Sequence, residues 1–305
     1  MRRFMKKILL FAGLVLFSQR AIAQESEALV FTRIERNPRA AAMAGAGTAS
    51  LYNAAYSGFG KAAMLSFAEG TMEIGAGFQR WAPGDAIEKA THLQLGASAR
   101  FSSFGVALGA AFQSGVPVGD FAPSDRLAAL GFSWRLGRRL GVGLNLRYAG
   151  QTLAPKQSVH GFSTDLSVGV CLPGGFSLIA GISTLGNRVK GSQEDRDFLQ
   201  PAHLFAGAAW HRLLADVHEI ELAADGEYAA NGAAAFAFGA EYAYDKTFYA
   251  RTGYRLASAR SVLPSHLAAG LGVRFAGFSI EAAWMGAASY AVKNNTLTLG
   301  FGYRF

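Results

Sequence analysis

The feature that most constrains the fold is an alternation of apolar and polar residues that repeats in short segments from residue 71 to the end. In 92–102, Leu93, Leu95 and Phe101 fall on one face of an extended chain, and His92 and Arg100 fall on the other. Successive side chains of a strand point to opposite sides, so the pattern suits strands with lipid on one face and a lumen on the other. Each segment has about ten residues, the length of a tilted membrane-crossing strand.

About fourteen segments follow this pattern, and an even number is expected of a single-chain bacterial barrel. They lie near 71–81, 92–102, 105–113, 126–136, 140–151, 162–172, 175–184, 203–211, 218–226, 234–244, 247–256, 267–275, 277–287 and 295–305. The sequence therefore predicts an all-β fold, a transmembrane antiparallel β-barrel of about 14 strands over residues 71–305. The helix-like stretch HRLLADV blurs one strand boundary, at 211–217.

Short and long connections alternate along this region. The short ones are 103–104, 137–139, 173–174, 245–246 and residue 276. The long ones are 82–91, 114–125, 152–161, 185–202, 257–266 and 288–294. Short periplasmic turns and longer outer loops distinguish outer-membrane barrels from soluble β-sandwiches.

The last strand carries a candidate assembly signal. Apolar residues alternate from Leu297 to Phe305, and Tyr303 and Phe305 lie on the apolar face. A last strand of this kind, ending in Phe, resembles the signal that the barrel insertion machinery reads. The expected partners are thus outer-membrane lipid and that machinery. Trp81, Trp134, Trp210 and Trp284 fall near strand ends, where an aromatic girdle is expected.

Residues 1–23 have the pattern of a signal peptide. Four basic residues precede an apolar run, Ile8–Phe17, that is too short to span a bilayer comfortably. Ala21-Ile22-Ala23 is a small-x-small cleavage site, so we expect cleavage after Ala23 and a location in the bacterial outer membrane. The single cysteine, Cys171, leaves no internal disulfide.

The charge balance argues against a nucleic-acid partner. Five of the 29 basic residues and none of the 21 acidic residues lie in 1–23, which leaves 24 basic and 21 acidic residues, a net charge of +3. Nucleic-acid binding needs basic residues clustered on one face. The high overall charge is therefore mostly a property of the signal peptide.

Most charged residues of the barrel fall at positions that face the lumen, because a charge on the lipid-facing side costs free energy. They are Glu73, Arg100, Arg135, Arg147, Asp165, Glu219, Glu221, Glu241, Arg251, Arg255, Arg274 and Glu281. We expect them to pair with one another or with a plug. The alternative is that they line a conduction path.

Residues 24–70 do not alternate, and we expect them to form a hatch inside the barrel. The stretch from Arg39 to Leu51 is rich in small residues, which suit close packing in a narrow space. A barrel of about fourteen strands has a lumen too wide for its own side chains to fill. The alternative is a periplasmic tail.

The hatch sequence shows a resemblance. Asn37-Pro38-Arg39, Met43 and Gly45-Ala46-Gly47, followed by the strand pattern, resemble the PorV/PorQ family, which is related to the long-chain fatty-acid transporter (FadL-like) barrels. Asn37, Pro38, Arg39, Met43, Gly45 and Gly47 are its hatch motif here. Two positions depart from the pattern: Ala44 stands at a usual glycine, and Gly60-Lys61-Ala62 stands at a usual Asn-Pro-Ala.

Motifs for enzymatic chemistry are missing from the sequence. It has no Gly-x-Ser-x-Gly elbow, no Walker loop and no His-Glu-x-x-His, so we predict that the chain is not an enzyme and uses no cofactor. Three histidines each start a strand near the outer rim, a pattern that suggests a metal site: His92, His203 and His266. They lie on strands far apart around the barrel, so we expect rim residues and no metal.

Two functions follow from the resemblance. The PorV/PorQ likeness implies an accessory or substrate-handling component of envelope secretion of the type IX kind, with secretion-system proteins as partners. The alternative, implied by the fatty-acid transporters, is a plugged channel for a small hydrophobic molecule. The small and polar inward faces weigh slightly against the alternative. The hatch still offers apolar side chains for a pocket: Phe31, Leu51, Tyr52, Tyr56, Phe59 and Met64.

Overall fold

The computed structural model describes residues 27–52, 54–81, 90–115, 121–155, 157–190, 197–289 and 292–305. The signal peptide, its cleavage site and most of the first long loop lie outside these residues. None of the helices in the described ranges is long and apolar enough to cross a membrane.

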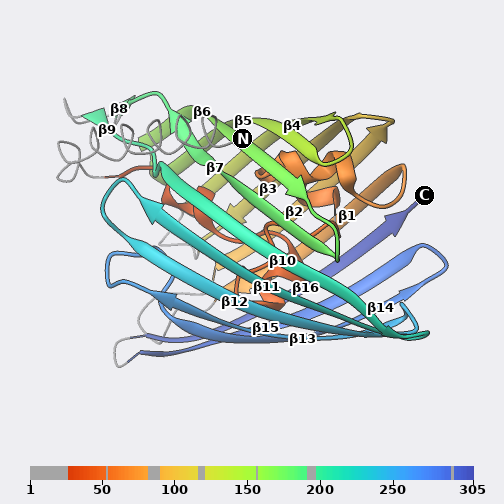
Figure 1. Cartoon of the computed structure of the whole chain (residues 1–305). Helices are drawn as coiled ribbons and strands as arrows, with labels where there is room; N and C mark the ends of the chain where they lie inside the picture. Colours follow the sequence, from red (N-terminus) through yellow and green to blue (C-terminus); the bar gives the residue numbers. More distant parts are fainter. Residues whose placement is uncertain are drawn as a thin grey trace.

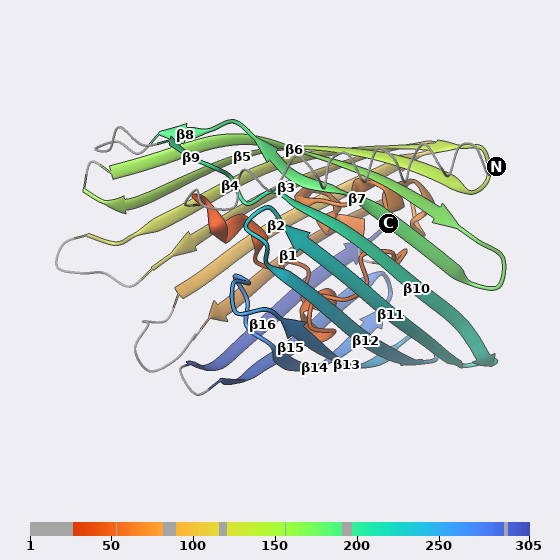
Figure 2. The same cartoon turned by 60° about the vertical axis from the view of Figure 1, so that its left-hand side comes forward.

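The chain forms a closed, 14-stranded antiparallel barrel, as the alternation predicts (Figures 1 and 2). Each barrel strand pairs with the barrel strands before and after it, and β1 pairs with β16 to close the ring. Closure follows a regular register, in which Ala76 lies opposite Phe301 and Phe78 lies opposite Leu299. The barrel therefore has no free sheet edge.

Within the described residues, four short helices precede the strands: η2 (Val30–Arg33), α2 (Pro38–Ala42), η3 (Ala54–Phe59) and η4 (Ala62–Phe67). The strands are β1 (Met72–Trp81), β2 (Ala90–Phe101), β3 (Phe104–Ser114), β4 (Ser124–Leu136), β5 (Leu140–Ala154), β6 (Gln157–Cys171), β7 (Phe176–Gly186), β8 (Val189–Lys190), β9 (Asp197–Phe198), β10 (His203–Ala215), β11 (His218–Ala229), β12 (Ala234–Tyr244), β13 (Phe248–Ala257), β14 (His266–Phe275), β15 (Phe278–Ser289) and β16 (Val292–Arg304).

The two faces of the wall have the expected polarity. On β2, Leu93 and Leu95 are 52% and 61% exposed on the outside, and the intervening Gln94 is buried in the lumen. The twelve charged residues predicted to point inward are all buried or half-buried. Their ion pairs join them to one another and to the segment inside the barrel, for example Arg147 to Asp165 and Arg39 to Glu221.

Three loop predictions need correction. Strands β5 and β6 extend past the expected boundaries and leave only residues 155–156 between them, and β15 and β16 leave only 290–291. Once two strands leave the membrane side by side, continued pairing still satisfies their backbone groups. The third loop, 185–202, contains the small β8–β9 pair. The stretch read as helix-like, 211–217, is the end of β10 and the turn that follows it.

The described part of the segment 24–70, which we expected to form the hatch, lies within the barrel in both views (residues 27–52 and 54–70, red to orange in Figures 1 and 2). The helix α2 contacts β13 to β16, and η3 and η4 contact the opposite part of the wall, chiefly β2 to β6. The segment thus bridges the lumen. We call residues 27–70 the hatch below, and its role as a plug stays a prediction.

The end of the chain completes an aromatic belt at the short-turn end. The ring of Tyr303 lies 4.6 Å from the rings of both Phe278 and Phe305, and the Phe305 amide donates to the Met72 carbonyl at 3.0 Å. Trp134 packs against Phe104 in the same belt, with ring centres 5.1 Å apart. The recognition of Tyr303 and Phe305 by insertion machinery stays a prediction.

Candidate functional site

The hatch motif folds around a short helix. Asn37 caps α2, because its Oδ1 accepts the Arg39 amide at 3.0 Å, and Pro38 occupies the first helical position. The helix ends where Ala44 and Gly45 adopt left-handed backbones, with φ of 57° and 88°. The Gly45 amide then donates to the Ala40 carbonyl at 2.8 Å. The chain therefore turns back sharply at the motif's first glycine.

Arg39 fixes this helix to the barrel wall. It is 1% exposed, and it donates to Glu221 at 2.7 Å, to Glu241 at 2.8 Å and to the Ser50 hydroxyl at 2.8 Å. Burial alone would lower the pKa of Arg39, but the two carboxylates raise it above its ordinary value. The guanidinium is therefore always charged, and it joins the hatch to two strands, β11 and β12.

The rest of the motif packs directly on the wall. Met43 fills the space above Gly239, where an added Cβ would lie 2.7 Å from the Met43 Cβ. The Gly47 amide donates to Asp225 Oδ2 at 2.5 Å, and the Thr48 hydroxyl donates to the same carboxylate. The hatch is therefore held by buried ion pairs and close packing on the β11–β13 side.

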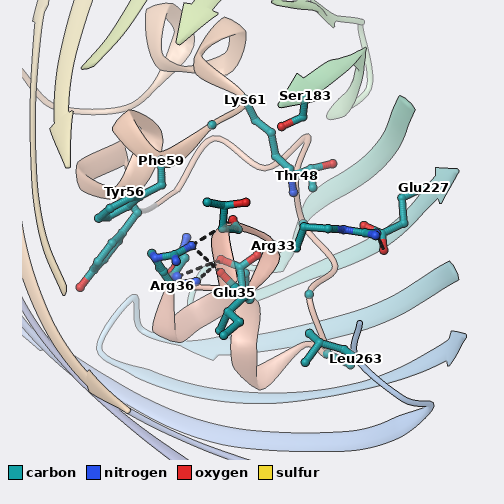
Figure 3. Close-up of a pocket in the computed structure, with 18 of the residues that line it drawn as sticks. Arg33, Glu35, Arg36, Thr48, Tyr56, Phe59, Lys61, Ser183, Glu227 and Leu263 are labelled. Atoms are coloured by element: carbon teal, nitrogen blue, oxygen red, sulfur yellow. Dashed lines mark hydrogen bonds and ion pairs between the residues drawn. The ribbon is translucent and has the colours of Figure 1, made fainter. Parts of the chain in front are cut away.

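A cavity of about 180 Å³ remains between the hatch and the outer loops (Figure 3), which we call the outer cavity. Its floor is hatch, and its rim includes His203, His266 and Leu263 at the long-loop end of the barrel. Apolar side chains on its lining include Ile34, Tyr56, Phe59, Met64 and Met285. Charged side chains on its lining are Arg33, Glu35, Arg36, Lys61, Arg147, Glu227 and Arg255.

A second cavity, of about 400 Å³, lies at the short-turn end, which we call the inner cavity. Its lining includes Glu69, Glu73, Lys246 and Arg304, all near the turns and the chain end. Tyr52 is the residue that lines both cavities. The Tyr52 side chain therefore lies between the space that faces the outer loops and the space that faces the periplasmic turns.

The Tyr52 ring is held from several sides. The guanidinium of Arg39 lies 5.4 Å from its centre and that of Arg274 lies 5.8 Å away. The hydroxyl is 3.2 Å from His211 Nε2. Burial raises the pKa of Tyr52, so the hydroxyl stays neutral at physiological pH. A neutral ring held between cations can separate the cavities and still move as one side chain.

The structure brings together only part of the predicted apolar pocket. Tyr52, Tyr56, Phe59 and Met64 line the outer cavity. Phe31 and Leu51 do not line it and pack instead into the apolar clusters beside it. The charged lining residues of the hatch, and Glu227 of the wall, were not among the residues predicted from the sequence. Of these charged lining residues, Lys61 could have been noticed in the sequence, because this lysine stands where the resemblance expects proline.

The histidines predicted to be rim residues lie apart. His203 and His266 border the outer cavity, each with Nδ1 near the carbonyl of a preceding proline, at 3.2 and 2.9 Å. No three metal-ligating side chains among the described residues are arranged to hold an ion.

Comparison with known proteins gives no match to any family model or to any curated protein. Solved structures do match. The Ralstonia pickettii toluene transporter TbuX has a TM-score of 0.65 and 12% identity over 88% of this chain and 98% of its own. The monoaromatic hydrocarbon channel CymD gives 0.63 and 14% over 88% and 97%, and the Pseudomonas putida toluene transporter TodX gives 0.61 and 15% over 92% and 98%.

The chain shares the fold of these hydrocarbon channels. A Pseudomonas aeruginosa FadL homologue, at a TM-score of 0.52 and 11% identity, has the same fold. The comparisons give no support to PorV/PorQ membership or to type IX secretion in particular. The secretion role that the sequence analysis put first is therefore less well supported than its transport alternative.

Proposed function

We propose that this protein is a plugged outer-membrane channel that admits a small molecule past its hatch and performs no enzymatic reaction. The observation that carries the proposal is the pair of cavities that share Tyr52, one at each end of the lumen. A molecule entering between the outer loops would reach the periplasmic side once this one ring moves aside.

The fold comparisons support a cargo with an apolar part. Among the proteins with this fold, TbuX and TodX are toluene transporters and CymD is a monoaromatic hydrocarbon channel. The outer cavity here offers Tyr56, Phe59 and Met64 as apolar surface, and binding pockets for small molecules combine such surface with a few placed polar groups. We therefore propose a small molecule with an apolar body as the cargo.

Replacing Tyr52 by alanine should join the two cavities. We expect the Tyr52→Ala barrel to carry a steady ion current in planar bilayers, whereas the intact chain stays nearly closed. The reason is steric, because the substitution removes the ring that lines both cavities. The measurement is single-channel current at equal protein insertion.

Tyr56→Ala is the matched control. Tyr56 belongs to the same hatch and lines the outer cavity but not the inner one, so its loss should enlarge the outer cavity and leave the current low. Equal currents in the two variants, or no current in Tyr52→Ala, would argue against Tyr52 as the barrier.

A further inference from the structure

We infer that the outer cavity takes a compact organic carboxylate, whose anionic end meets Arg33, Lys61 and Arg255 and whose apolar body meets Tyr56 and Phe59. This inference rests on the proposed function and narrows its cargo. It differs from the uncharged hydrocarbons named for the proteins of similar fold.

The cavity lining is rich in positive charge. Five of its lining residues are Arg or Lys, and two are acidic. Arg33 and Arg255 share a single carboxylate, Glu227, which Arg33 reaches at 2.7 Å. A further carboxylate whose charge acts on Arg33, that of Glu27, accepts a hydrogen bond from Asn231, so the two guanidinium groups share Glu227 as their ion-pair partner. A second carboxylate would complete the pairing.

Lys61 adds a further cation to the lining of this cavity. Among the described residues it makes no ion pair or hydrogen bond, and its ammonium lies 5.8 Å from the centre of the Phe205 ring. Two acidic groups close enough to feel its charge are already bonded. Asp225 accepts from Gly47 and Thr48, and Glu227 accepts from the two arginines.

Several buried donors on the lining also have no partner within the described protein. Arg33 Nη1, Arg147 Nε and Arg255 Nε are fully buried and make no hydrogen bond there. The side chain of Arg33 is only 4% exposed. A buried donor without an acceptor costs free energy, so rotation of these side chains toward the acceptor oxygens of a ligand would be favourable, and a hydrocarbon offers no such acceptor. Of the five cations, Arg147 is neutralised by Asp165, and Arg36 donates to the carbonyls of Phe31, Thr32 and Ile34. Arg33, Lys61 and Arg255 remain as the anion-binding groups.

The apolar side of the cavity favours a ligand with an apolar part over a small inorganic anion. The rings of Tyr56 and Phe59 stack with centres 6.5 Å apart, and Figure 3 shows them across the cavity from Arg33 and Glu227. A cavity of about 180 Å³ has room for one ring-sized body between these walls. Inorganic phosphate or acetate would satisfy the cations and leave the aromatic side unused.

Benzoate is a suitable probe, and neutral benzamide has nearly the same shape. We expect benzoate to bind the purified full-length barrel saturably in isothermal titration calorimetry, with benzamide and acetate at least about tenfold weaker. Lys61→Gln should weaken benzoate binding by about tenfold, the equivalent of one lost charge-assisted contact. Lys190→Gln, which changes an exposed lysine of β8 that lines neither cavity, is the matched control and should leave benzoate binding unchanged.

The outcomes separate this inference from the channel proposal. Equal binding of benzoate and benzamide would overturn the anion site, and equal binding of acetate would overturn the aromatic half. Loss of affinity in Lys190→Gln as large as that in Lys61→Gln would show a general charge effect and overturn the site. Failure of Tyr52→Ala to conduct overturns the route past Tyr52 on which the proposed channel rests, and it has no bearing on which of these probes binds.

Discussion

A chain that lacks residues 27–66 should form an open pore with large, persistent ion currents in planar bilayers. About eight strands already enclose a lumen that side chains can fill, so fourteen strands leave space for a further segment. The hatch fills that space down to backbone contact: a Cβ added to Gly58 would lie 2.6 Å from the Leu108 carbonyl carbon. Its removal leaves the wall's inward glycines and charges facing water.

The barrel itself should survive this deletion, because every barrel strand keeps both of its neighbours. Heat-modifiable migration on gels and a β-type circular dichroism spectrum check that it folds. A folded, truncated barrel that stays closed would refute the plug. Strong conduction by the intact chain would also refute it and would favour a general porin.

Arg39→Met should loosen the hatch without removing it. The substitution leaves Glu221 and Glu241 buried with one cation fewer, and breaking a buried ion pair in this way costs about 3–5 kcal/mol. Much of that cost can be relieved if the hatch leaves its seat and water reaches the carboxylates. We expect a lower temperature of unfolding by heat-modifiability and intermittent ion currents through the folded barrel.

Two further variants test the cause of this effect. Adding Glu221→Gln to Arg39→Met removes one uncompensated negative charge, and it should restore part of the lost stability. Arg138→Met changes an exposed turn arginine and should shift stability by no more than about 0.5 kcal/mol. A loss in Arg138→Met as large as that in Arg39→Met, or no recovery in the double variant, would show that the ion pairs do not hold the hatch.

The strands could be predicted from the sequence because lipid acts as a uniform solvent. Side chains that face lipid are apolar, and charged or polar side chains face the lumen. Leu93 and Leu95 therefore alternate with Gln94, and this period of two can be seen within a single strand. The limits of β5 and β6 could not be predicted in the same way. Outside the membrane, pairing depends on the partner strand, which leaves no periodic signature.

The site was less predictable, because it depends on contacts between residues far apart in the chain. Arg39 meets Glu221 and Glu241 across 182 and 202 positions. The aromatic residues Tyr52, Tyr56 and Phe59 could be proposed as lining from their type. That Tyr52 alone would line both cavities depends on how the hatch turns at Gly45 and Gly47, and no local pattern specifies this.

Reversible modification at position 52 tests the channel most directly. In a Tyr52→Cys, Cys171→Ser barrel, the small side chain should leave the path open and give a measurable current. Attaching a benzyl group to that cysteine with benzyl methanethiosulfonate should restore a ring and stop the current, and dithiothreitol should bring the current back. A current that is unchanged by complete modification would show that the route through this barrel does not pass Tyr52.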